Sequence, residues 1–180
     1  MRFVALLKSL NVGAHNRISM KDLAQVFVDA GCDDVSTYIQ SGNVLFSASA
    51  AHARKVPALV TAALARGFDV ASPVVLRDAA ALAKVGRHNP FLARGEDEAR
   101  LHVAFLDGAP PAAKVKALDH ARWAPDAFVV QGPDIYLCLP NGVGRTRLTT
   151  SWFETQLGLP NTWRNWKSVK DLARRVESAP

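Results

Sequence analysis

Residues 35–48, VSTYIQSGNVLFSA, decide the fold because they carry the clearest local signal in the chain. Two runs rich in β-branched and aromatic residues flank Ser41-Gly42-Asn43, a loop that tolerates a positive φ. This pattern predicts a β-hairpin.

The segments on either side of the hairpin complete a regular order of elements. We expect a strand at 2–10, a helix from Ser19 to Gly31, a helix within 50–66 and a strand at 71–77. Pro57 indicates that the helix within 50–66 either starts near this residue or kinks there. The order β-α-β-β-α-β over about 75 residues is that of the ferredoxin-like plait.

The second half of the sequence repeats this order. It predicts a strand at 100–107, a helix after Pro110-Pro111, a hairpin around Gly132-Pro133, a helix around 147–157 and a final helix from near Ser168. No alternating strand is evident between the last two helices, so the second plait either lacks its last strand or keeps a stub at 161–166.

The fold class follows from these two repeats. We predict an α+β protein with two ferredoxin-like α/β-plait domains, each built on an antiparallel sheet, plus a C-terminal helix. The first domain is expected to cover residues 1–92, including a bridging helix from Asp78, and the second, modified plait to cover residues 93–180.

Composition and charge exclude several classes of protein. The 180 residues are 49% hydrophobic and 21% charged, which excludes a chain whose main state is disordered. The net charge of +6 favours anionic partners. No apolar stretch reaches the roughly 20 residues that span a bilayer, and the N-terminus lacks a signal-peptide pattern. We therefore expect a cytoplasmic protein with no membrane partner, in which Cys32 and Cys138 are free, buried thiols.

The loop after the first strand is the first candidate site. It gathers Lys8, Asn11, Gly13, Asn16 and Arg17 between a strand and the start of a helix. Backbone N–H groups and basic side chains in such a place can hold a phosphate or carboxylate. The loop matches neither the P-loop nor the dinucleotide motif GxGxxG. The alternative is an ordinary turn in which asparagine and glycine supply unusual backbone conformations.

Two later segments also combine basic residues with glycine or tryptophan. Residues 139–151, LPNGVGRTRLTTS, could receive an anion or form a solvated connection. In residues 162–167, TWRNWK, the alternation of aromatic and cationic residues suits stacking on bases with phosphate pairing. It suits equally two tryptophans that pack a terminal helix, with Arg164 stacked across a ring.

No pattern for catalysis or metal binding is evident in the sequence. The five histidines lack the spacing of metal ligands, no GxSxG motif is present, and no paired carboxylates lie near the glycine loops. We therefore expect no metal and no cofactor. Whether the protein is an enzyme stays open at this point.

Five motifs in order carry a resemblance to a known family. They are FVALLKSLNVGAHNRISMKDL at 3–23, TYIQSGNVLF at 37–46, HNPF at 88–91, YLCLPNGVGRTRL at 136–148 and TWRNWKSVKDL at 162–172. Together they resemble the bacterial family catalogued as domain of unknown function 1697. The resemblance implies two α/β-plait-like domains and no established activity, cofactor or catalytic residue. That family usually has Arg-Gly after its first strand, where this chain has Lys8-Ser9, so a side chain replaces the glycine while Lys8 keeps the charge.

The leading hypothesis is a protein that binds an anionic ligand, either a nucleotide, a nucleic acid or a phosphorylated metabolite, through its glycine-containing basic loops. The expected ligand-binding residues are Lys8, Asn11, Gly13, Asn16, Arg17, Ser41, Gly42, Asn43, Arg164 and Asn165. Antiparallel first and third strands would bring the first loop and the turn Ser41–Asn43 to one end of the sheet.

Two alternatives to ligand binding alone remain. One is an enzyme acting on a small phosphorylated or carboxylated substrate between the domains, with His15 or His88 as the titratable group. The other is a structural or dimerisation module without a ligand. The sequence leaves both a monomer and a homodimer open.

Overall fold

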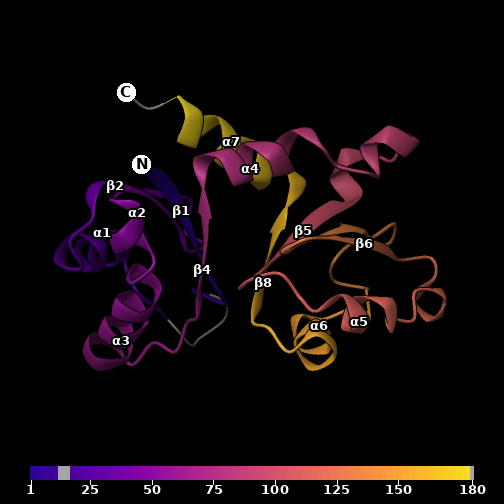
Figure 1. Cartoon of the computed structure of the whole chain (residues 1–180), viewed down its shortest axis with the longest axis horizontal. Coiled ribbons are helices and arrows are strands. Elements are labelled where there is room, and N and C mark those ends of the chain that lie inside the picture. Colours follow the sequence, from indigo (N-terminus) through magenta and orange to yellow (C-terminus); the bar gives the residue numbers. More distant parts are fainter. Residues whose placement is uncertain (12–16, 179–180) are drawn as a thin grey trace. The chain divides into compact units, whose positions relative to one another are not determined.

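The computed structural model describes residues 1–11 and 17–178, and it divides the chain into two compact units (Figure 1). Unit 1 comprises Met1–Ala83 and Leu172–Pro180, and unit 2 comprises Lys84–Asp171. Each unit contains one four-stranded antiparallel sheet, so the fold is mixed α+β. That residues 1–92 and 93–180 fold as separate domains stays a prediction.

Unit 1 is built on sheet A, whose strand order is β2-β3-β1-β4. Its elements are β1 (Arg2–Leu7), α1 (Met20–Asp29), β2 (Asp33–Tyr38), β3 (Asn43–Ser47), α2 (Ala50–Ala53), α3 (Val56–Phe68), β4 (Val74–Asp78) and the first half of α4 (Ala79–Arg87). The predicted hairpin is present as β2 and β3. Helix α3 begins at Val56 with Pro57 in its first turn, so of the two alternatives left by the sequence the helix starts near the proline.

Helices α1 and α3 cover one face of sheet A. The alternate β1 residues Phe3, Ala5 and Leu7 form one apolar cluster with Phe27 of α1 and Leu64 of α3. The β3 residue Phe46 contributes a ring to the same cluster, with its centroid 5.6 Å from that of Phe3 and 5.5 Å from that of Phe27. Because successive side chains of a strand point to opposite faces of the sheet, every second residue of β1 packs against the helices.

Unit 2 is built on sheet B, whose strand order is β6-β7-β5-β8. Its elements are the 3-10 turns η1 (Leu92–Arg94), η2 (Glu98–Arg100) and η3 (Ala121–Trp123), with β5 (Leu101–Leu106), α5 (Ala112–Lys116), β6 (Ala127–Gln131), β7 (Asp134–Cys138), α6 (Thr150–Leu157), β8 (Asn161–Asn165) and the start of α7 (Trp166–Glu177). Helix α7 runs on into unit 1, to which its residues from Leu172 belong.

Strand β8 is the element whose presence the sequence left open. Of the two alternatives that the sequence left open, a missing last strand and a stub at 161–166, the structure has the strand: β8 pairs with β5 from Asn161 to Asn165. Three of these residues, Asn161, Thr162 and Arg164, are polar and buried. The strand shows no apolar alternation because it buries polar groups, so its signal is absent from the hydropathy pattern.

The two sheets repeat the same local hydrogen bonds. The N–H of Leu7 donates to the Gly42 carbonyl at 2.8 Å, and that of Leu106 donates to the Pro133 carbonyl at 2.8 Å. The last residue of β4 and that of β8 each cap the helix that follows. Asp78 Oδ1 accepts from the Ala81 N–H at 2.7 Å, and Asn165 Oδ1 accepts from the Ser168 N–H at 2.8 Å. The second half of the chain is thus a structural repeat of the first.

Two properties of the whole chain complete the description. Cys32 and Cys138 are buried, free thiols, and burial raises the pKa of each to about 11. Among the helices of the described residues, none combines the length and the apolar character needed to cross a membrane.

Candidate functional site

The first loop and the hairpin turn lie against each other at one end of sheet A. The Leu7 N–H donates to the Gly42 carbonyl at 2.8 Å. Gly42 has a φ of 68°, and a Cβ added to it would lie 2.9 Å from Leu7 Cβ and 3.1 Å from Leu10 Cβ. Only a glycine allows this approach, because the position combines a left-handed backbone with direct contact to its neighbours.

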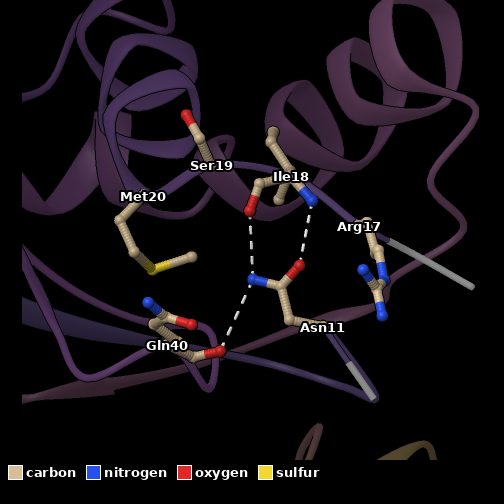
Figure 2. Close-up of a pocket in the computed structure, with 6 residues that line it drawn as sticks. All are labelled: Asn11, Arg17, Ile18, Ser19, Met20 and Gln40. Atoms are coloured by element: carbon tan, nitrogen blue, oxygen red, sulfur yellow. Dashed lines mark hydrogen bonds between the residues drawn. The ribbon is translucent and has the colours of Figure 1, made fainter. Parts of the chain in front are cut away.

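Asn11 closes the loop that follows β1 (Figure 2). Its Nδ2 donates to the Ile18 carbonyl at 3.0 Å, and its Oδ1 accepts from the Ile18 N–H at 2.9 Å. The same Nδ2 lies 3.4 Å from the carbonyl of Gln40, the residue before the turn. Asn11 therefore ties the two ends of the loop together and links the loop to the hairpin.

A hollow of about 540 Å³ opens beside this closure. Its described lining residues are Asn11, Arg17, Ile18, Ser19, Met20 and Gln40 (Figure 2). Arg17 is exposed and supplies the charge among them, while the amide of Gln40 and the sulfur of Met20 lie near each other on one side. The hollow thus combines one guanidinium with amide and hydroxyl groups.

The start of helix α1 forms one wall of the hollow. Ser19 Oγ accepts from the Asp22 N–H at 3.0 Å and donates to Asp22 Oδ2 at 2.6 Å. The Asp22 carboxylate offsets the partial positive charge at this helix end. The cationic character of the hollow therefore comes from Arg17 rather than from the helix.

The remaining predicted residues of unit 1 have identifiable structural partners. The Lys8 N–H donates to the Pro73 carbonyl at 3.0 Å, and Ser72 Oγ donates to the Lys8 carbonyl at 2.7 Å. Asn43 is fully buried, and its Nδ2 donates to the Tyr38 carbonyl at 3.1 Å and to Ser41 Oγ at 2.9 Å. The amide of Asn43 thus shapes the turn, and a ligand contact of these residues stays a prediction.

Gly13 and Asn16, together with His15, lie outside the described residues. Arg164 and Asn165 lie on β8 of unit 2. Arg164 is buried, its Nη1 donates at 2.8 Å to both Thr162 Oγ1 and the Trp163 carbonyl, and desolvation lowers its pKa to about 10. That Arg164 and Asn165 share a surface with the first loop stays a prediction.

The sequence did not single out several residues of the hollow. Gln40, Ile18 and Met20 line it, and the sequence indicated Ser19 only as the start of a helix. Gln40 directly precedes the predicted turn, so its position in the sequence was the available signal. Within residues 1–11 and 17–178, no group of three or more His, Cys, Asp or Glu side chains is placed to hold a metal ion.

The closure by Asn11 gives a first testable prediction. Replacing Asn11 with alanine is expected to cost about 2 kcal/mol of unfolding free energy, because the amide hydrogen bonds are lost and alanine disfavours the φ of 55°. Asn11→Gly is the control, since glycine accepts that φ, and it is expected to cost about 1 kcal/mol. Urea denaturation measures both, and faster hydrogen exchange at the Ile18 amide should accompany both changes. Unchanged exchange at Ile18 would contradict the closure.

Comparison with known proteins adds the following. The family described as "Protein of unknown function (DUF1697)" matches residues 1–136. The structure is similar to that of the conserved bacterial protein SP0830 from Streptococcus pneumoniae, with a TM-score of 0.69 and 19% identity, covering 97% of this chain and 98% of that one. At 19% sequence identity, this similarity shows that the two proteins share a fold. No curated protein matches the chain. Since the family match covers most of the sequence, this chain belongs to the DUF1697 family of proteins of unknown function.

Proposed function

We propose that unit 1 binds an anionic ligand, a nucleotide, nucleic acid or phosphorylated metabolite, in the hollow beside the start of α1. The observation that carries the proposal is the placement of the exposed Arg17 guanidinium in a polar hollow of about 540 Å³. A volume of this order suits a small ligand. A guanidinium binds phosphate or carboxylate oxygens through two parallel N–H bonds, which gives charge and direction together.

The walls of the hollow support selective recognition. Asn11 is held by Ile18 and Gln40, so the wall it forms is fixed before a ligand arrives. A fixed wall lowers the ordering cost of binding. The side-chain amide of Gln40 offers both a donor and an acceptor for the polar groups that accompany a phosphate in nucleotides and sugar phosphates.

Two further parts of the proposal concern fold and location. We take each unit to be a ferredoxin-like plait, which the strand orders β2-β3-β1-β4 and β6-β7-β5-β8 support. We place the protein in the cytoplasm, which the free thiols of Cys32 and Cys138 support because a reducing compartment keeps thiols unpaired.

Isothermal titration with inorganic phosphate, ATP and a thymidine oligonucleotide tests the proposal. At least one probe is expected to bind, and Arg17→Gln is expected to weaken it by about tenfold or more, since a charge-assisted hydrogen bond is lost. Arg66→Gln is the matched control, because Arg66 is an exposed arginine in the last turn of α3 and does not line the hollow.

Two results would overturn the proposal. One is the absence of binding by all three probes. The other is equal affinity in the wild-type protein and in Arg17→Gln. A melting temperature unchanged by Arg17→Gln would show that any loss of affinity is not a loss of folded protein.

A further inference from the structure

The two sides of the hollow beside the start of α1 differ in their chemistry (Figure 2). The exposed guanidinium of Arg17 lies at one side, and the thioether of Met20 lies with the side-chain amide of Gln40 at the other. Asn11 lies between the two sides, where its hydrogen bonds to Ile18 hold it in place. The hollow therefore offers a cation at one side and an amide beside an apolar sulfur at the other.

The side-chain amide of Gln40 is available to a ligand. Gln40 is exposed, and the group that Asn11 Nδ2 approaches at 3.4 Å is its backbone carbonyl. Among the described residues, the side-chain amide of Gln40 has no hydrogen-bond partner. A side-chain amide carries a donor and an acceptor next to each other. It therefore matches a ligand edge that presents one acceptor and one donor side by side.

Backbone strain lies directly before Gln40, in the turn between β2 and β3. Ile39 has a φ of 49° and is 50% exposed. A β-branched residue rarely adopts this left-handed conformation, and burial of an exposed side chain does not offset the strain. Ser9 and Asn11, in the loop after β1, also have positive φ values, of 53° and 55°. Strained residues of this kind cluster at ligand sites, which supports a binding role for Gln40.

An adenine base matches the amide and the thioether together. Along one edge of adenine, N7 accepts a hydrogen bond and the N6 amino group donates one, and a glutamine amide pairs with both. Guanine presents two acceptors along the same edge and is matched better by a cationic side chain. A methionine sulfur makes favourable contacts with aromatic rings, so Met20 suits the same base.

The charges around the hollow favour a single phosphate group. Among the described lining residues, Arg17 is the one arginine or lysine, and residues 12–16, VGAHN, contain neither type. The Asp22 carboxylate accepts from Ser19 Oγ at 2.6 Å and adds negative charge at the start of α1. One guanidinium pairs with one phosphate through two parallel N–H bonds. Further phosphates, as in a triphosphate or a nucleic acid, need further cations.

We propose that this hollow binds an adenine nucleoside monophosphate, an inference that rests on the proposed anion site and names its ligand. The phosphate pairs with Arg17, the N6 and N7 edge of the base pairs with the amide of Gln40, and the base contacts Met20. Ligand pockets have volumes of about 300–1,000 Å³. The hollow of about 540 Å³ lies within this range.

Isothermal titration of the full chain with adenosine monophosphate (AMP) and related compounds tests the proposal. AMP is expected to bind at least about tenfold more tightly than adenosine, which lacks the phosphate, and ribose 5-phosphate, which lacks the base. GMP is expected to bind about tenfold more weakly than AMP, because its base edge does not match the amide. ATP and an adenine hexanucleotide are expected to bind no more tightly than AMP.

Two variants assign the orientation of the nucleotide. Gln40→Leu is expected to weaken AMP binding by about tenfold and to leave ribose 5-phosphate binding unchanged, because the amide contacts the base alone. Arg17→Gln is expected to weaken binding of AMP and ribose 5-phosphate and to leave adenosine binding unchanged. Gln156→Leu is the matched control, because Gln156 is exposed in α6 of unit 2 and does not line the hollow. Melting temperatures equal to that of the wild-type protein would show that the variants are folded.

The adenine ligand and the anion site fail in different ways. Binding of ribose 5-phosphate or inorganic phosphate through Arg17 as tightly as AMP would keep the anion site and overturn the adenine ligand. Unchanged AMP affinity in Gln40→Leu, or GMP binding as tight as AMP binding, would do the same. Tighter binding of ATP or of the hexanucleotide than of AMP would overturn the monophosphate. Absence of Arg17-dependent binding by every compound would overturn both proposals.

Discussion

Replacing Phe46 with alanine is expected to lower the unfolding free energy by about 4 kcal/mol, the cost of a cavity left by a buried aromatic ring. Phe46 is fully buried, and its ring lies between those of Phe3 and Phe27 at centroid distances of 5.6 and 5.5 Å. These three rings join two strands of sheet A to helix α1. The surrounding core cannot close the space, because the strand pairing of β1 and β3 fixes the positions of Phe3 and Phe46.

Phe68→Ala is the matched control for this change. Phe68 is the last residue of α3 and is 39% exposed, so its replacement is expected to cost less than about 1 kcal/mol. The tryptophans lie at positions 123, 152, 163 and 166, all in unit 2, so their fluorescence follows that unit. Urea denaturation should therefore be followed by far-UV circular dichroism and by hydrogen exchange at β1 and β3 amides. Equal costs for Phe46→Ala and Phe68→Ala would contradict this description of the core.

The substitution Gly42→Ala is expected to cost about 3 kcal/mol of unfolding free energy. Two effects add: a side chain at a φ of 68° is strained, and the new Cβ meets Leu7 Cβ at 2.9 Å. The contact is with atoms next to the backbone, so the neighbours cannot move away without shifting the end of β1. The loop and the turn that flank the proposed ligand site would then separate.

Gly132→Ala separates these two effects. Gly132 has a φ of 59° in the hairpin turn of unit 2, but a Cβ added there meets no atom within 4 Å. Its replacement is expected to cost only the backbone strain, about 1 kcal/mol. Urea denaturation measures the unfolding free energy of both variants. The difference between them is the cost of the contact between the new Cβ at position 42 and its neighbours. If Gly42→Ala and Gly132→Ala lower the unfolding free energy equally, the close contact between the turn and β1 does not contribute to stability, which would contradict this prediction.

The sequence predicted the fold where local chemistry and burial agree. The hairpin at 35–48 combines a turn that tolerates positive φ with runs of β-forming residues, and the structure has β2 and β3 there. The sequence left the presence of β8 open, because Asn161 and Arg164 are buried with hydrogen bonds to the Thr150 carbonyl and to Thr162 Oγ1 and the strand therefore shows no apolar alternation. Such burial depends on hydrogen-bond partners, which lie within β8 for Arg164 and in α6 for Asn161, and hydropathy cannot indicate them.

In the candidate site, too, some features follow from local sequence and topology, whereas others depend on partners that are distant in the sequence. The meeting of the first loop with the turn follows from antiparallel neighbours, and topology could therefore predict it. The closure of the loop by Asn11 depends on Ile18, seven residues further on, and the contribution of Gln40 comes from the turn between β2 and β3. Such side-chain pairs need the three-dimensional positions of both partners, so residue type alone indicated Asn11 but not what it does.

The discontinuous composition of unit 1 has a consequence for biosynthesis. Leu172 and Val176 of α7 are buried, and Arg175 lies with its guanidinium 4.6 Å from the centre of the Tyr38 ring. These residues leave the ribosome only after the whole of unit 2, residues 84–171, has been translated. At translation rates of about 5–20 residues per second, that interval is about 4 to 18 seconds. During this time the nascent first unit lacks its final helical segment, which gives chaperones a defined period in which to act on it.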